Sequence, residues 1–221
     1  GEPSENNCYE CIGAAYQYLV SGKRDRRQQS RSSVVVVDPS RIVLFGRSLG
    51  TGPTVDLAAR LLSSSNGHKN NGTKTRRLAG VILQSPLESA GRCVLGELAS
   101  YALYPLDLFR NYEKIDHLAP VPVFIMHGTS DKVVPFASGK NLYESLIRAR
   151  RRATEQDKSP RSTNDDGGGS GHSDDDDSSV AYAPKWIPGI GHNDMPESEC
   201  IHGVTKFLQF LEERHQRLQQ R

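Results

Sequence analysis

The sequence has few of the features that mark secreted, membrane-spanning or nucleic-acid-binding proteins. It has four cysteines in 221 residues, and their scattered positions form no disulfide framework, which favours a reducing compartment. No apolar stretch approaches the roughly 20 residues that a membrane-spanning helix needs, and no segment has the pattern of a signal peptide. The net charge is only +2, so no global field favours nucleic acid or an acidic substrate. We therefore expect a cytoplasmic protein that does not bind nucleic acid.

The length is that of one domain with a substantial core, interrupted by three segments that lack core-forming residues. These segments are 23–33, 63–77 and 157–179, and they bury too little apolar surface to offset the entropy of ordering. We predict that all three are disordered surface insertions in a single domain. The chain begins with Gly1 rather than methionine, which leads us to expect further sequence upstream.

Cys8 and Cys11 form a single C-x-x-C pair with no second pair and no histidine at ligand spacing. On a helix the two residues lie one turn apart, and we predict that they pack against the core rather than bind zinc. No metal site and no cofactor are expected.

The ordered segments alternate between strand-like and helix-like patterns. A first amphipathic helix is predicted over 3–20, with Ser4 as its N-cap, and a second helix over 51–62. Buried strands are predicted at 41–45, 78–85, 121–128 and 180–187, whereas Val34 to Val37 fit either a strand or the end of an insertion. A last helix is predicted near the C-terminus. This alternation indicates an α/β fold with a mostly parallel sheet. The predicted inward faces are Ile12, Ala15, Tyr16 and Leu19 in the first helix, and Ile201, Val204, Phe207, Leu208 and Leu211 in the last.

Gly46 to Gly50 match the pattern G-x-S-x-G between a predicted strand and a predicted helix. In this pattern the serine occupies a strained strand-to-helix turn, and side chains two positions before and after it are expected to collide with neighbouring backbone. Such a turn presents the Ser48 hydroxyl above the sheet and leaves the Leu49 amide free to stabilise an oxyanion. Pro53 falls in the first turns of the helix, where its missing N–H costs little.

A nucleophilic serine needs a base, and the base needs a carboxylate to orient it. Asp131 and His192 follow the third and fourth predicted strands, which is the chain order serine, acid, histidine. His127, at the end of the third strand, is predicted to brace a loop. Asp194 is too close in sequence to His192 to be its natural orienting acid. The remaining histidines on predicted helices are interpreted as surface or packing residues: His117, His202 and His215.

Several segments together resemble the α/β-hydrolase domain-containing protein 17 family. They are GEPSENNCYECIGAAYQYL, RIVLFGRSLGTGPTVDLAAR, VILQSPLESAGR, PVFIMHGTSDKVVPFASGKNLYE and IPGIGHND. The resemblance implies an α/β-hydrolase fold and a membrane-associated serine hydrolase that removes palmitoyl groups from protein cysteines. It also implies that Ser48 is the nucleophile, Asp131 the orienting acid and His192 the base. S-acylated proteins are the implied partners, with peripheral contact at the cytoplasmic face of membranes for the full-length protein.

The chain lacks the N-terminal cysteine-rich segment of that family and its first strands, including a His-Gly loop that donates the second oxyanion-hole N–H. In the family fold the strand at 41–45 is central, so its missing neighbour is expected to leave backbone groups unpaired. We predict that the isolated chain is unstable or prone to aggregate. We also predict weak activity, because losing one oxyanion donor typically costs about 10²–10³ in rate.

The segment 86–117 is more apolar than a surface loop should be. It fits either a groove for an acyl chain or a cap packed on the sheet. Two other functions remain open, namely a serine peptidase of the aminopeptidase or prolyl-oligopeptidase type and a catalytically silent interaction module. The candidate substrate-binding residues are Val94, Leu95, Leu98, Tyr101 and Leu106.

Overall fold

The computed structural model describes residues 2–21, 36–63, 78–100, 106–158 and 181–220. Most of the three predicted insertions lies outside these residues. Where their ends are described they are helical, because Ser63 closes one helix and residues 157–158 close another. Among the described residues, no helix combines the length and the apolar character required to cross a membrane.

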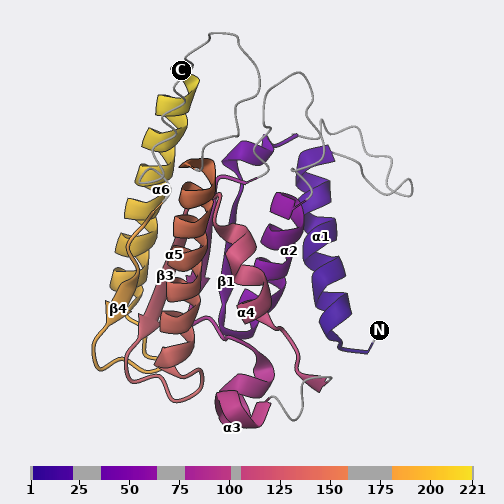
Figure 1. The fold of residues 1–221 in the computed structure, drawn as a ribbon, viewed down its shortest axis with the longest axis vertical. Helices are drawn as coiled ribbons and strands as arrows, with labels where there is room; N and C mark the ends of the chain where they lie inside the picture. The colour runs from indigo at the N-terminus through magenta and orange to yellow at the C-terminus, as the bar shows by residue number, and fades with distance from the viewer. Residues whose placement is uncertain (1, 22–35, 64–77, 101–105, 159–180, 221) are drawn as a thin grey trace.

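In the described residues, four parallel strands form one sheet, in the order β1-β2-β3-β4 (Figure 1). They are β1 (Val43–Arg47), β2 (Gly80–Gln84), β3 (Val123–Gly128) and β4 (Lys185–Ile187). Each neighbouring pair is joined through a crossover that contains a helix, as parallel pairing requires. The α/β class with a parallel sheet is therefore confirmed.

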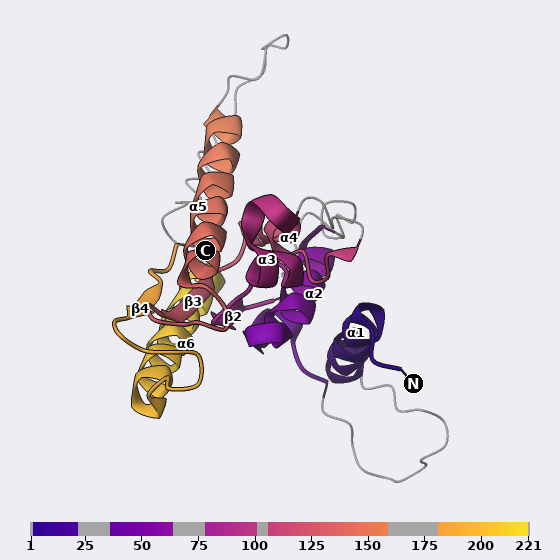
Figure 2. The ribbon, with the colours of Figure 1, turned by 90° about the horizontal axis from the view of Figure 1, so that it is seen from below.

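The helices cover the two faces of this sheet unequally. One core cluster joins β1, β2 and β3 to the helices α1, α2 and α5, whereas the opposite cluster joins Ile82, Phe124 and Met126 to α6 alone. Figure 2 shows α6 on one side of the sheet and α5 and α2 on the other. The helices are α1 (Glu5–Ser21), α2 (Thr51–Ser63), α3 (Ala90–Ser100), α4 (Asn111–Lys114), α5 (Phe136–Lys158) and α6 (Glu197–Gln219).

The predicted inward faces of the first and last helices are wrong in part. In α1, Ser4 accepts the cap hydrogen bond from the Asn7 amide as predicted, but Leu19 is exposed and Tyr16 is the buried residue. Ala15 is also exposed. In α6, Ile201 and Leu208 are exposed. The physical reason is that α1 packs mainly on α2, and α6 mainly on β2 and β3, so each buries a narrower stripe than a fully covered helix would.

The prediction of a buried strand at 41–45 is also only partly correct. β1 begins two residues later, and in the described part of the chain it pairs with β2 alone, at one edge of the sheet. Phe45 is 52% exposed, because the cluster under α6 is built mainly on β2 and β3 and includes Val43 of β1 but not Phe45. Val36 and Val37 lie outside the sheet, although the Val37 amide donates to the Leu19 carbonyl.

The prediction that Cys8 and Cys11 pack against the core is wrong. Both are free thiols on the exposed side of α1, which contacts α2 through its other face. The predicted instability of the isolated chain stays a prediction.

Candidate active site

The chain turns sharply at Ser48, between the end of β1 and the start of the helical segment that follows. Arg47 is the last residue of β1 and is fully extended, while Ser48 has a φ of 50°. A positive φ is uncommon for a residue other than glycine and stores backbone strain. Residues Ser48–Gly50 form a 3₁₀ turn (η2) that continues into α2, and the Thr51 hydroxyl closes the turn by donating to the Ser48 carbonyl at 2.6 Å.

The two glycines of the turn differ in what they permit. A Cβ atom on Gly46 would lie 2.6 Å from Thr54 Oγ1 and 2.8 Å from the Gly50 carbonyl oxygen, so β1 and the start of α2 could not approach as they do. A Cβ atom on Gly50 would meet nothing within 4 Å. The expectation that both positions exclude a side chain is therefore correct for Gly46 and wrong for Gly50, which faces open space.

This difference predicts opposite effects on stability. Gly46→Ala should lower the free energy of unfolding by about 1–3 kcal/mol, because the new methyl group overpacks a contact that includes backbone. Gly50→Ala should leave it unchanged or raise it by about 0.4–1 kcal/mol, since alanine has less freedom to lose on folding. Urea unfolding of both variants measures this, and equal destabilisation by the two substitutions would contradict it.

Three side chains from separate segments meet at the carboxyl ends of the strands. These strand ends lie at the lower end of the ribbon in Figure 1. His192 Nδ1 lies 2.7 Å from Asp131 Oδ2, and His192 Nε2 lies 2.9 Å from Ser48 Oγ. An ionised carboxylate can only accept, so Nδ1 carries the proton and Nε2 accepts from the serine hydroxyl. The structure thus brings together Ser48, Asp131 and His192, three residues that lie far apart in the sequence.

The Asp131 carboxylate is fully buried and held by several donors. Its Oδ1 accepts from the amides of Val133 and Val134, both at 2.9 Å, while its Oδ2 faces His192. Burial alone would raise the pKa of Asp131, but the hydrogen bonds from His192 and from the two amides outweigh it and hold this pKa below its usual value. The carboxylate is therefore ionised and fixed in orientation at neutral pH.

His127 supports the same loop from below. Its ring is fully buried, and Nε2 donates to the Val134 carbonyl at 3.0 Å and lies 3.4 Å from Asp131 Oδ2. Burial lowers the pKa of His127, which favours the neutral ring. A Cβ atom on Gly139 would lie 2.4 Å from His127 Nδ1, so the glycine makes room for the imidazole. This geometry agrees with the predicted role of a loop brace.

The other acids and histidines considered from the sequence lie apart from this cluster. Asp194 is exposed, and Asp131 rather than Asp194 is the carboxylate bonded to His192. The His117 ring lies near the Ser63 hydroxyl, His202 is exposed on α6, and the His215 ring lies near the Gln219 amide. In the described part of the chain, no group of three histidine, cysteine or acidic residues is arranged to hold a metal ion.

The Leu49 amide occupies the first turn of the η2–α2 segment, where N–H groups have no partner within the helix. Its position directly after Ser48 suits an oxyanion donor, and that role stays a prediction. Leu49 is 56% exposed, and Val133, two residues after Asp131, is 59% exposed. The sequence predicts a role for the amide of Leu49 but not for its side chain, and it does not single out Val133. The one signal for Val133 is an apolar residue in the loop that carries Asp131.

The predicted substrate-binding residues are exposed wherever their side chains are described, and their role stays a prediction. The side chains of Val94 and Leu106 are 82% and 74% exposed, and Leu95 is also exposed. The side chain of Leu98, on α3, and all of Tyr101 lie outside the described residues.

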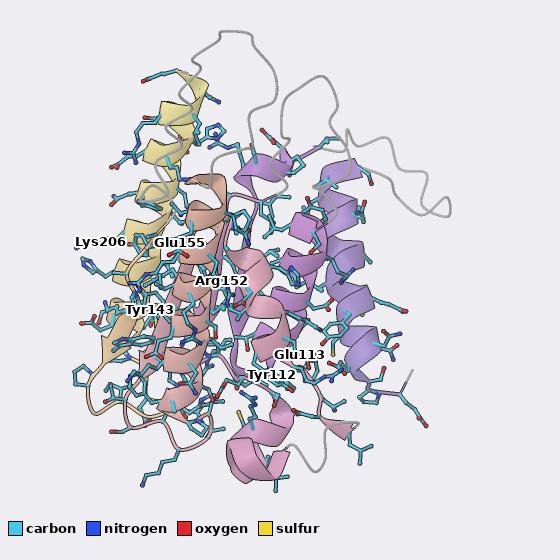
Figure 3. All side chains as sticks on the ribbon, in the orientation of Figure 1. Tyr112, Glu113, Tyr143, Arg152, Glu155 and Lys206 are labelled. Carbon is cyan, nitrogen blue, oxygen red and sulfur yellow. The ribbon has the colours of Figure 1, made fainter. Side chains whose placement is uncertain are left out.

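The start of α3 is anchored by a nearly buried ion pair. Arg92 Nη1 lies 2.8 Å from Glu88 Oε1, and the guanidinium stacks on the Tyr112 ring at 3.8 Å. Figure 3 shows Tyr112 of α4 at the end of the molecule where α3 lies. The Asn141 amide of α5 donates to the other Glu88 oxygen at 3.2 Å. These contacts hold the start of α3 against α4 and α5.

Comparison with known proteins gives relatives that share most of this chain. Alpha/beta hydrolase domain-containing protein 17C of Mus musculus is 32% identical over 195 residues, which are 88% of this chain and 42% of the relative. Alpha/beta hydrolase domain-containing protein 17B of Xenopus laevis is 31% identical over the same share of this chain and 46% of its own length. The chain thus spans less than half the length of these relatives. No protein-family model matches it.

Solved structures share the fold at low sequence identity. Puromycin hydrolase superposes with a TM-score of 0.55 at 12% identity, covering 94% of this chain and 25% of that protein. A puromycin-hydrolyzing peptidase of Mycobacterium tuberculosis gives a TM-score of 0.53 at 17% identity, with the same coverage of both chains. At this level of identity the likeness shows the α/β-hydrolase fold and nothing about the substrate.

Proposed function

Because the chain belongs, over the region it matches, to the alpha/beta hydrolase domain-containing protein 17 family, we propose that it is a serine hydrolase that cleaves thioesters or esters through an acyl-enzyme. The proposed natural substrates are S-acylated proteins, with palmitoyl groups as the acyl chains removed. The observation that carries the proposal is the continuous chain of hydrogen bonds from Asp131 through His192 to Ser48, a serine in a strained turn.

In the proposed mechanism His192 Nε2 takes the proton of Ser48 as Oγ attacks the acyl carbonyl carbon. The Leu49 amide stabilises the negative charge that develops on the carbonyl oxygen. Asp131 holds the imidazole in the required tautomer and stabilises the imidazolium that forms. His192 then gives the proton to the leaving thiolate or alkoxide, and a water molecule activated by the same imidazole hydrolyses the acyl-enzyme.

The surroundings of the triad support an acyl substrate rather than a charged one. Leu49 directly follows Ser48, and Val133 lies two residues after Asp131. Both residues are apolar and more than half exposed. Their loops follow the carboxyl ends of parallel strands, as does α3, whose Val94 is also exposed. An acyl chain that covers such side chains gains about 25 cal/mol per Å² of apolar surface removed from water. Peripheral contact with the cytoplasmic face of membranes is proposed for the full-length protein on the basis of the family resemblance.

A substrate panel tests the proposal. The chain is assayed with thioesters of acetyl, octanoyl and palmitoyl groups and with a peptide amide, each also against the Ser48→Ala variant. We expect Ser48-dependent turnover that increases with acyl length, and little turnover of the amide. Faster cleavage of the amide would support a peptidase, and no Ser48-dependent turnover of any substrate would support a silent module.

A further inference from the structure

Arg47 joins the strand that carries the nucleophile to the loop that carries the base. It is the last residue of β1, directly before Ser48, and its side chain reaches the loop after β4. Its Nη2 donates to the His192 carbonyl oxygen at 3.3 Å and to Asn193 Oδ1 at 3.2 Å. One guanidinium nitrogen therefore contacts both the backbone of the base and the side chain that follows it.

The loop of His192 needs such a contact because β4 and β1 lie at opposite edges of the described sheet. The first part of the loop is fixed to the end of β3. The Ser130 amide donates to the Ile190 carbonyl at 3.0 Å, and the Gly189 amide donates to Thr129 Oγ1 at 2.9 Å. These bonds hold the first part of the loop at the end of β3, next to Asp131. The Arg47 contacts hold its later residues, His192 and Asn193, at the end of β1.

We infer that Arg47 is a positioning residue that keeps the His192 imidazole within hydrogen-bonding distance of Ser48. This inference rests on the proposed function. Arg47 touches no reacting atom, so its effect acts through the placement of the base. Both of its acceptors are neutral, so Arg47 holds the loop through hydrogen bonds and not through an ion pair. Small displacements of a catalytic group reduce rate strongly, which gives a weak exposed contact a measurable effect on turnover.

Replacement of Arg47 by methionine keeps the apolar stem and removes every donor. In Arg47→Met we expect the second-order rate of fluorophosphonate labelling at Ser48 and kcat on a thioester to fall about tenfold, with KM changed less than about twofold. Arg47→Lys should be intermediate, because an ammonium group can donate to one acceptor at a time. Asn193→Ala should give a smaller loss, and adding it to Arg47→Met should cause little further loss because the two act through one contact.

Arg41→Met is the matched control. Arg41 lies just before the other end of β1 and forms an exposed ion pair with Glu212 at 3.3 Å, so its loss should not alter labelling. Labelling of Arg47→Met at the wild-type rate, or a change in KM alone, would overturn the inference and leave the proposed function intact. If the wild-type chain is not labelled, the proposed function fails. Hydrogen exchange of residues 188–195 then decides: faster exchange in Arg47→Met than in Arg41→Met supports the loop contact, and equal exchange overturns it.

Discussion

We expect Ser48→Ala to reduce thioester hydrolysis by about 10⁴-fold or more, to the background rate. The reason is that no other hydroxyl bonds His192 Nε2 among the described residues, so no substitute can form the acyl-enzyme. Substrate binding should change little, because the hydroxyl acts mainly in the transition state. Steady-state hydrolysis of a long-chain thioester measures the loss.

Ser130→Ala is the matched control for this substitution. Ser130 is an exposed serine beside Asp131, and the hydrogen bond that it makes to Ile190 comes from its backbone amide. Its variant should retain wild-type turnover. Residual hydrolysis by Ser48→Ala within tenfold of wild type would show that the chemistry takes place elsewhere.

Asp131→Asn is expected to lower kcat by about 10⁴-fold while the fold is kept. The asparagine side chain can occupy the same volume, but its amide donates where the carboxylate accepted. His192 would then present an unprotonated Nδ1 to residue 131 and a protonated Nε2 to Ser48, and it could not take the serine proton. The loss should appear in kcat rather than in KM, as for a group that acts in the transition state.

Asp194→Asn provides the comparison for the acid. Asp194 is also acidic and lies two residues from His192, but it is exposed and does not bond the imidazole. Its neutralisation should leave kcat within about twofold of wild type, as expected for a surface substitution. A larger loss in Asp194→Asn than in Asp131→Asn would reverse the assignment of the orienting acid.

The order of strands and helices, and the meeting of Ser48, Asp131 and His192, could be predicted from the sequence because each depends on local patterns. Apolar runs ended by glycine or proline give the strands, and the strand-to-helix turn at Ser48 is specified by residues within ten positions of it. In a parallel sheet the carboxyl ends of the strands lie at one edge. We can therefore predict that loops after different strands meet at this edge without knowing the tertiary contacts.

Features that depend on coverage by distant elements could not be predicted. Phe45 is apolar and fits a buried strand, but its exposure depends on where α6 crosses the sheet. Leu19 and Leu208 fit a helical apolar face, and only the narrow contacts of α1 and α6 leave them exposed. Gly50 matches a motif whose spacing does not reveal that this position faces open space.

The contact of Arg47 was likewise not visible in the sequence. Arg47 is at the second position of G-x-S-x-G, where the pattern accepts any residue type, so its identity does not predict a contact. The two acceptors lie more than 140 positions away, and one of them is a backbone carbonyl that any residue would supply. Only the path of the loop after β4 brings them to the end of β1.

Peptide mapping after reaction of the intact chain with a fluorophosphonate tests the central claim most directly. The Asp131–His192–Ser48 chain of hydrogen bonds predicts a single adduct per molecule, on Ser48, that is lost in Ser48→Ala and formed far more slowly in Asp131→Asn. An adduct on another residue, or labelling of Ser48 at the same rate in Asp131→Asn as in wild type, would contradict it.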